Sequence, residues 1–159
     1  MTSADKYGIL VVERKRELEM IGFFDFDMTT AITIGKETPS LSQFTDSRFA
    51  VRDILNAKPT RLTSRMKKYR KVYILTARSS GNGKMRNAMK KYFLQNGIYI
   101  PNHRIIMLGD WETNLSTAEK KSKVLTKYSD KLGKIDFYDD DVHNIEHSRY
   151  IENVCGVFA

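Results

Sequence analysis

Residues 21–30 read IGFFDFDMTT, and this stretch decides the fold. Its opening, residues 21–26, is too continuously apolar for a strand with one wet face, so it predicts a strand covered on both faces. Between longer segments of helical periodicity come four similar runs, at residues 72–75, 105–108, 135–138 and 154–158. Apolar strands that alternate with helices predict an open α/β fold, with a parallel sheet of about five strands flanked by helices.

Two helices are well marked between these strands. Apolar residues recur at helical spacing from Met85 to Phe93, and Gly97 follows as a stop signal. The second helix begins at Ser116, which forms a capping-box pattern with Glu119, and should end near residue 133. Shorter helices are predicted around residues 47–56 and 60–69, on either side of Pro59.

The length of 159 residues and a hydrophobic content of 41% predict one domain, residues 1–159, with a packed core. Residues 30–70 would hold a small flap or helical insert, and residues 1–20 an N-terminal extension whose structure the pattern leaves open. We expect no membrane span and no secretory signal, because charge interrupts every apolar run. A single cysteine favours a reducing compartment, which indicates the cytoplasm.

The net charge of +8 is distributed unevenly along the chain. Residues 61–134 carry 18 basic and 4 acidic side chains, and the run from Arg61 to Lys91 contains eleven Lys or Arg with no Asp or Glu. The acidic residues gather instead near positions 25 and 140. This asymmetry suggests a polyanionic partner beside a carboxylate site, although basic residues also commonly solvate helix faces.

Polar side chains follow three of the predicted strands directly. Asp25 and Asp27 stand at the end of the first strand, Thr76 and Arg78 follow the second with Ala77 between them, and Asp139, Asp140 and Asp141 follow the fourth. In open α/β sheets the carboxyl ends of the strands share one edge, where ligands bind. Carboxylates gathered there repel one another unless a cation neutralises them, and oxygen ligands suit magnesium. The sequence therefore predicts a Mg²⁺ site at this edge, with Asp25 and Asp27 converging on it.

Four segments resemble the motifs of the haloacid dehalogenase-like (HAD) phosphohydrolase superfamily. FFDFDMTT resembles its DxDxT motif, YILTAR its second motif, the lysine of STAEKKSKVL its third, and FYDDD its acidic fourth motif. They occur in the expected order across residues 20–145. TARSSGNGKMRNAMKKYF and FYDDDVHNI further resemble the 3′-phosphatase domain of phage polynucleotide kinases and related end-repair phosphatases. No GxxxxGK[ST] kinase motif is present, and Met28 stands where the superfamily commonly has glycine.

The resemblance implies a Rossmann-like fold and a Mg²⁺-dependent phosphatase that works through a phosphoaspartyl intermediate. Asp25 would be the nucleophile, and Asp27 would be the general acid and base, with its main-chain carbonyl also binding the metal. Thr76 would hydrogen-bond the phosphoryl oxygens. Lys121 would offset charge on Asp25 and on the transferring group, and its place on the apolar helix stripe favours it over Lys120 and Lys123.

Several assignments stay open on the sequence. Asp140 is favoured as the remaining metal ligand with Asp139 supporting it, although the reverse also fits. Asp141 is predicted to be a helix cap. The expected substrate contacts are Thr29, Ala77, Arg78 and Lys84, and solvated surface positions are the alternative for the last two. We expect surface or packing roles for His103, His143 and His147, of which His143 deserves a test because it closely follows the fourth motif. Trp111 and Cys155 are expected to be packing residues.

The intervals after the first two motifs bear on the substrate. Members of the superfamily often carry a cap domain, but residues 30–70 and 79–104 leave no room for a full one. An open site beside the basic run favours a nucleic-acid end, DNA or RNA, and hence a polynucleotide 3′-phosphatase. The alternatives are a 5′(3′)-nucleotidase that acts on free nucleotides and a non-catalytic nucleic-acid-binding module.

Overall fold

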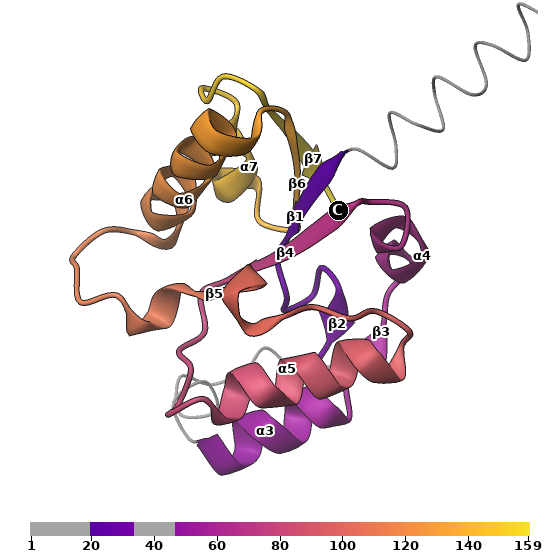
Figure 1. Ribbon diagram of the computed structural model, residues 1–159. Coiled ribbons are helices and arrows are strands. Elements are labelled where there is room, and N and C mark those ends of the chain that lie inside the picture. Colours follow the sequence, from indigo (N-terminus) through magenta and orange to yellow (C-terminus); the bar gives the residue numbers. More distant parts are fainter. Residues whose placement is uncertain (1–19, 34–46) are drawn as a thin grey trace, which may run out of the picture.

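The computed structural model describes residues 20–33 and 47–159 (Figure 1). The expected N-terminal extension, apart from Met20, and part of the insert after the first strand lie outside these residues. No described helix is both long and apolar enough to cross a membrane.

A five-stranded sheet with parallel pairing forms the centre of the molecule, in the order β5-β4-β1-β6-β7. The strands are β1 (Ile21–Phe24), β4 (Lys71–Thr76), β5 (Ile105–Met107), β6 (Ile135–Asp139) and β7 (Val154–Phe158). All five match the predicted apolar runs, and the arrangement is compatible with a Rossmann-like fold. Because β1 lies between β4 and β6, the residues that follow these three strands meet at one edge.

Helices cover both faces of the sheet, which explains the nearly unbroken apolar runs. The helices α3 (Ser47–Leu55) and α5 (Lys84–Gln95) lie on one face, and α6 (Thr117–Leu132) and α7 (Val142–Ser148) lie on the other (Figure 1).

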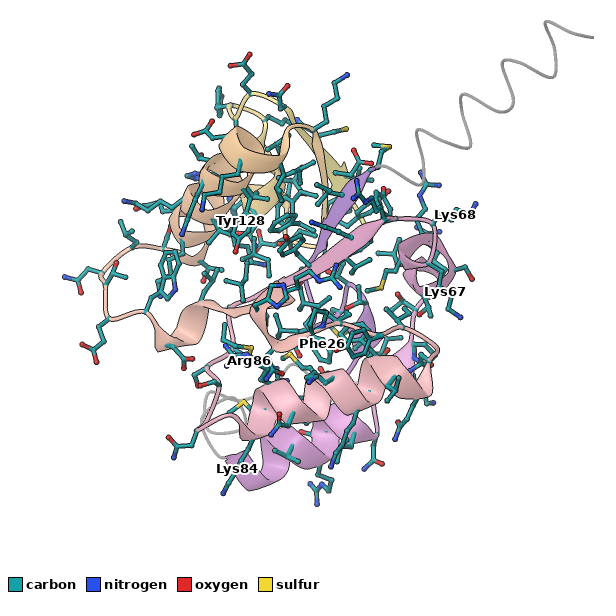
Figure 2. The ribbon with its side chains drawn as sticks, viewed as in Figure 1. Phe26, Lys67, Lys68, Lys84, Arg86 and Tyr128 are labelled. Carbon is teal, nitrogen blue, oxygen red and sulfur yellow. The ribbon has the colours of Figure 1, made fainter. Side chains whose placement is uncertain are left out.

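Neighbouring β1 residues supply two separate cores. Phe24 stacks on Tyr138 at 4.7 Å between ring centroids in the core under α5, and Phe23 stacks on Tyr73 at 4.5 Å in the core under α6. Phe26 also belongs to the core under α5, and Figure 2 shows it on the α5 side of the sheet.

The helix signals are confirmed. The Ser116 side chain accepts a hydrogen bond from the Glu119 N–H at 3.2 Å, and α6 ends at Gly133, whose φ is 85°. The helix α5 likewise ends just before Gly97, whose φ is 78°. Glycine tolerates this left-handed backbone at both helix ends.

The segment between β1 and β4 forms a small flap. Residues of β2 (Ala31–Ile32) pair antiparallel with β3 (Lys58–Pro59), and the short helix α4 (Leu62–Met66) follows. The helix predicted over residues 60–69 is shorter than expected. Its first two residues connect β3 to α4, and at its end the Tyr69 side chain points into the protein, where its hydroxyl hydrogen-bonds with other side chains. Within the described part of this segment, no cap domain covers the sheet edge.

Candidate metal and phosphate site

Three carboxylates meet at the carboxyl edge of the sheet. Asp25 follows β1, Asp139 ends β6, and Asp140 comes next. One oxygen from each lies within 4.8 Å of the other two. A set made only of carboxylate oxygens is the donor type that hard divalent cations such as Mg²⁺ prefer, so these residues fit such an ion.

A buried lysine from α6 joins two of these carboxylates. The Lys121 Nζ donates to Asp25 Oδ1 at 2.8 Å and to Asp139 Oδ2 at 2.7 Å, and the residue is 2% exposed. Burial alone would lower the pKa of Lys121, but the two carboxylates outweigh it and raise this pKa, so the lysine stays charged. Lys123 is exposed and Lys120 reaches only the Leu108 carbonyl, at 3.5 Å, so the preference for Lys121 is confirmed as to position.

Asp25 is the most perturbed acid of the cluster. Burial raises its pKa to about 7, against the lowering effect of the Lys121 charge, and the neighbouring Asp139 raises it further. The side chain of Asp25 is 10% exposed, so a small part of it is accessible to a ligand. A divalent cation beside it would favour the ionised form.

Asp139 is fully engaged by its surroundings. Its Oδ1 accepts from the Asp141 N–H at 2.9 Å, and its Oδ2 accepts from Lys121 and from the Asn144 side chain, the latter at 2.9 Å. It is 1% exposed. These contacts suit a residue that positions the lysine rather than one that presents a vacant oxygen.

Asp140 is less buried and less committed. Its Oδ1 is 3.1 Å from the Thr29 hydroxyl, which also lies 2.9 Å from Asp25 Oδ2. The single proton of this hydroxyl serves only one of the two oxygens at a time. Burial raises the pKa of Asp140 against the lowering effect of the Thr29 hydrogen bond, and the charge of Asp139 raises it further. Of the two acids at the end of β6, Asp140 has the less committed carboxylate, and which of them would bind a metal stays a prediction.

The loop after β1 is closed by its own backbone. The N–H groups of Thr29, Thr30 and Ala31 all point to the Phe26 carbonyl at 3.1 to 3.3 Å. The Thr30 hydroxyl donates to the Asp25 carbonyl at 2.9 Å. Met28 adopts a φ of 63° in this loop, the left-handed region that glycine favours.

The Asp27 carboxylate is not one of the three that group together, although its charge lies close enough to Asp25 to raise the pKa of that residue. The Arg78 Nε and one terminal nitrogen each donate to an Asp27 oxygen at 2.8 Å, and the Thr33 hydroxyl donates to the same carboxylate at 2.8 Å. Strand alternation could place two acids on one side, but it could not reveal this bidentate partner. The role expected for the Asp27 main-chain carbonyl stays a prediction.

Arg78 is 3% exposed, so the solvated-surface alternative is wrong for this residue. Its backbone N–H donates to the buried Thr76 hydroxyl at 3.2 Å, which brings the two residues together at the end of β4. Ala77 and Lys84 are exposed, and Thr29 is buried within the cluster.

The loop that carries Arg78 is held by residues that the sequence did not single out. A Cβ on Gly109 would lie 2.5 Å from the Ser79 nitrogen, and the Gly109 N–H donates to the Arg78 carbonyl at 3.1 Å. The Asp110 carboxylate accepts from the Ser80 N–H at 2.9 Å. Asn144 was missed as well, although it lies within the FYDDDVHNI segment.

Of the remaining predictions, some are confirmed and one is wrong. Asp141 is the N-cap of α7 and accepts from the His143 N–H at 2.8 Å, as predicted. The three histidines are exposed, and Trp111 packs against the core under α6. The packing role expected for Cys155 is wrong, because this residue is exposed on the edge strand β7.

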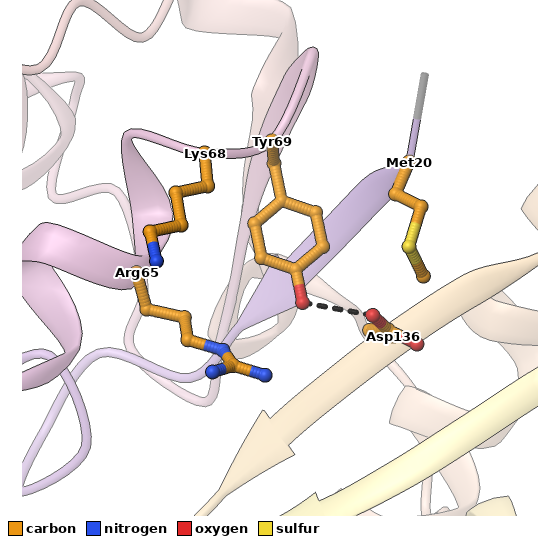
Figure 3. A pocket seen from close by; sticks show the side chains of 5 residues that line it. All are labelled: Met20, Arg65, Lys68, Tyr69 and Asp136. Carbon is orange, nitrogen blue, oxygen red and sulfur yellow. Dashed lines mark hydrogen bonds between the residues drawn. The ribbon is translucent and has the colours of Figure 1, made fainter. Parts of the chain in front are cut away.

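A separate hollow lies at the opposite edge of the sheet, where the strands begin (Figure 3). It has a volume of about 240 Å³ and is lined by Met20, Arg65, Lys68, Tyr69 and Asp136. Several of its polar groups bond one another: the Tyr69 hydroxyl lies 2.8 Å from Asp136 and 2.7 Å from the Tyr138 hydroxyl, which accepts from Arg65. Burial raises the pKa of Tyr69, so this hydroxyl stays protonated. These side chains therefore serve as hydrogen-bond partners for one another.

Comparisons with protein-family models, with curated proteins and with solved structures found no match for this chain.

Proposed function

We propose that the protein is a Mg²⁺-dependent phosphomonoesterase of the HAD-like type that removes 3′-phosphates from polynucleotide ends. One observation carries the proposal: the Asp25 carboxylate lies at a strand end between a buried lysine and a second acidic pair. The four resembling motifs contribute to this one edge of the sheet, although they are far apart in the sequence.

Asp25 would act as the nucleophile. One of its oxygens would bond to phosphorus while the ester oxygen leaves with its electron pair, and water would then hydrolyse the phosphoaspartate. Lys121 would hold the Asp25 carboxylate in place and offset its charge, and Thr76 would donate to a phosphoryl oxygen. Mg²⁺ held by Asp25 and Asp140 would screen the repulsion between the carboxylate and the phosphate dianion.

Asp27 would protonate the leaving oxygen and later accept a proton from water. Both of its oxygens accept from Arg78, so this role requires substrate binding to loosen the pair. An incoming phosphate offers the guanidinium another anion, and arginine binds phosphate in the same bidentate manner as a carboxylate.

The preference for a polynucleotide rests on the surroundings of the site. Among the described residues the flap is small and leaves the sheet edge uncovered, which suits a large substrate. No Asp or Glu occurs between Asp53 and Asp110, a stretch that supplies β4, α5 and β5. A polyanion would be attracted to this side of the site, with an affinity that falls as salt rises.

Phosphate release tests this function directly. The substrates are a 3′-phosphorylated oligonucleotide, its 5′-phosphorylated counterpart and nucleoside monophosphates, each with and without Mg²⁺. We expect Mg²⁺-dependent release from the first substrate, loss of release in Asp25→Asn, and wild-type release in Asp141→Asn, because asparagine caps a helix as well as aspartate.

The other outcomes identify the alternatives. Full activity in Asp25→Asn would refute the assigned nucleophile. Faster release from mononucleotides would indicate a nucleotidase, and oligonucleotide binding without release would indicate a non-catalytic module.

A further inference from the structure

The outer side of α5 carries an exposed stripe that the proposed chemistry does not use. Lys84, Asn87, Lys91 and Leu94 recur at spacings of three and four residues, and all are exposed. Tyr99 follows the end of the helix and is 69% exposed. We refer to these five residues as the α5 track.

We propose that the α5 track binds the single-stranded part of the polynucleotide whose 3′-phosphate reaches Asp25. This inference rests on the proposed function, because it adds a second contact for the same substrate. It assigns phosphate contacts to the lysines and base stacking to Tyr99.

The direction of α5 supports the assignment. Because α5 connects the parallel strands β4 and β5, it runs back from the carboxyl edge of the sheet to the amino edge. Lys84, the first residue of α5, therefore lies at the end of the helix that follows the carboxyl end of β4, and Tyr99 comes after its other end (Figure 1). Twelve helical residues span about 18 Å, which corresponds to about five stacked nucleotides.

The far end of the track is hollowed and partly apolar. A depression of about 310 Å³ is lined by Asn87, Lys90, Lys91, Leu94, Tyr99 and Ile100. Leu94 is 62% exposed there, next to the exposed ring of Tyr99. An exposed aromatic ring beside lysines is the combination with which proteins bind single strands, since any base can stack on it while the cations contact phosphates.

The positive charge of α5 favours a polynucleotide over a protein or a free nucleotide as the ligand of the α5 track. The helix α5 contains four basic residues and no acidic one. One of the four, Arg86, turns away from the track, because its Nε donates to the Ile105 carbonyl of β5 at 3.3 Å. Lysines that remain on the outer side and continue toward the acidic cluster suit a chain with regularly spaced negative charges.

Two substrates of different length test the track. A 3′-phosphorylated dinucleotide can occupy the acidic cluster but cannot reach Tyr99, whereas a 3′-phosphorylated 12-mer of thymidine can. We expect Tyr99→Ala to lower kcat/KM for the 12-mer about 10-fold and to leave the dinucleotide unchanged, with Tyr99→Phe close to wild type. The slope of log affinity against log salt is negative, and Lys91→Gln should reduce its magnitude by about 0.7, whereas Lys127→Gln on the opposite face should leave it unchanged.

Equal loss on both substrates, or no loss on the 12-mer, would overturn the track. Binding of the fluorescent 12-mer to the Asp25→Asn protein, followed by anisotropy, separates this result from failure of the proposed function. If the wild type releases no phosphate, a 10-fold weaker affinity in Asp25→Asn/Tyr99→Ala than in Asp25→Asn still supports the track. Equal affinities of these two proteins would refute it.

Discussion

Replacing Lys121 with methionine in the metal-free protein removes the cation that two buried carboxylates share. Methionine has a similar length and fills the space of the lysine stem, so the main loss is the charge at 2.8 Å from Asp25 and 2.7 Å from Asp139. Breaking a buried ion pair from one side typically costs about 3–5 kcal/mol, because the remaining charge is left without compensation. We expect a loss of this size in the free energy of unfolding at pH 8.

The loss should shrink as the pH falls. Burial raises the pKa of Asp25 to about 7, and without Lys121 this carboxyl is still easier to protonate. At pH 5.5 the variant can therefore neutralise Asp25 by taking up a proton, which removes much of the unpaired charge. Urea unfolding at both pH values, with chelator present, measures the difference.

Lys123→Met is the matched control on the same helix. Lys123 is exposed, so its replacement should change the free energy of unfolding by less than about 0.5 kcal/mol at either pH. The reasoning fails if Lys121→Met costs no more than this control, or if its cost at pH 5.5 equals that at pH 8.

Three further predictions concern the same edge of the sheet. The metal-free wild type should lose the contribution of Asp25 to stability as the pH rises from about 4 to about 7, because the raised folded-state pKa means that folding takes up a proton in this range; denaturation midpoints across it, with and without Mg²⁺, test this. Met28→Gly should raise the free energy of unfolding by about 0.5–1 kcal/mol by relieving the φ of 63°, whereas Met28→Ala should give no gain in the same urea titration. Gly109→Ala should lower the thermal midpoint, at a cost of about 1–3 kcal/mol, because its Cβ would meet backbone atoms of the Arg78 loop at 2.5 to 2.8 Å; an unchanged midpoint would show that the loop yields freely.

Local patterns predicted the framework well. Continuous apolar runs identified all five strands of the sheet; for β1, β4, β5 and β6 the reason is burial, which leaves no polar alternation, whereas β7 is an edge strand with exposed residues. The Ser116 cap fixed the start of α6, and the apolar stripe fixed its rotation, so Lys121 could be distinguished from its neighbours. Each of these signals comes from residues that are close together in the sequence.

Pairing between distant segments could not be predicted in the same way. The Asp27 carboxylate is taken by Arg78, 51 residues later. The Thr29 hydroxyl lies within hydrogen-bond distance of both Asp25 and Asp140, and Asp140 is 111 residues after Thr29 in the sequence. The flap strands were missed because each has only two residues, too few for a periodic signal. Cys155 was assigned to packing because the pattern could not show that β7 is an edge strand.

The sequence by itself determined which residues form the strands, which strand ends carry acids, and which lysine faces the sheet. Only the tertiary structure decided which carboxylates group together: those of Asp25, Asp139 and Asp140 do, while that of Asp27 is paired with Arg78. The reason is physical. Secondary structure follows from the periodicity of a short segment, whereas the partner of a carboxylate depends on which side chains from distant segments lie close to it in the folded protein.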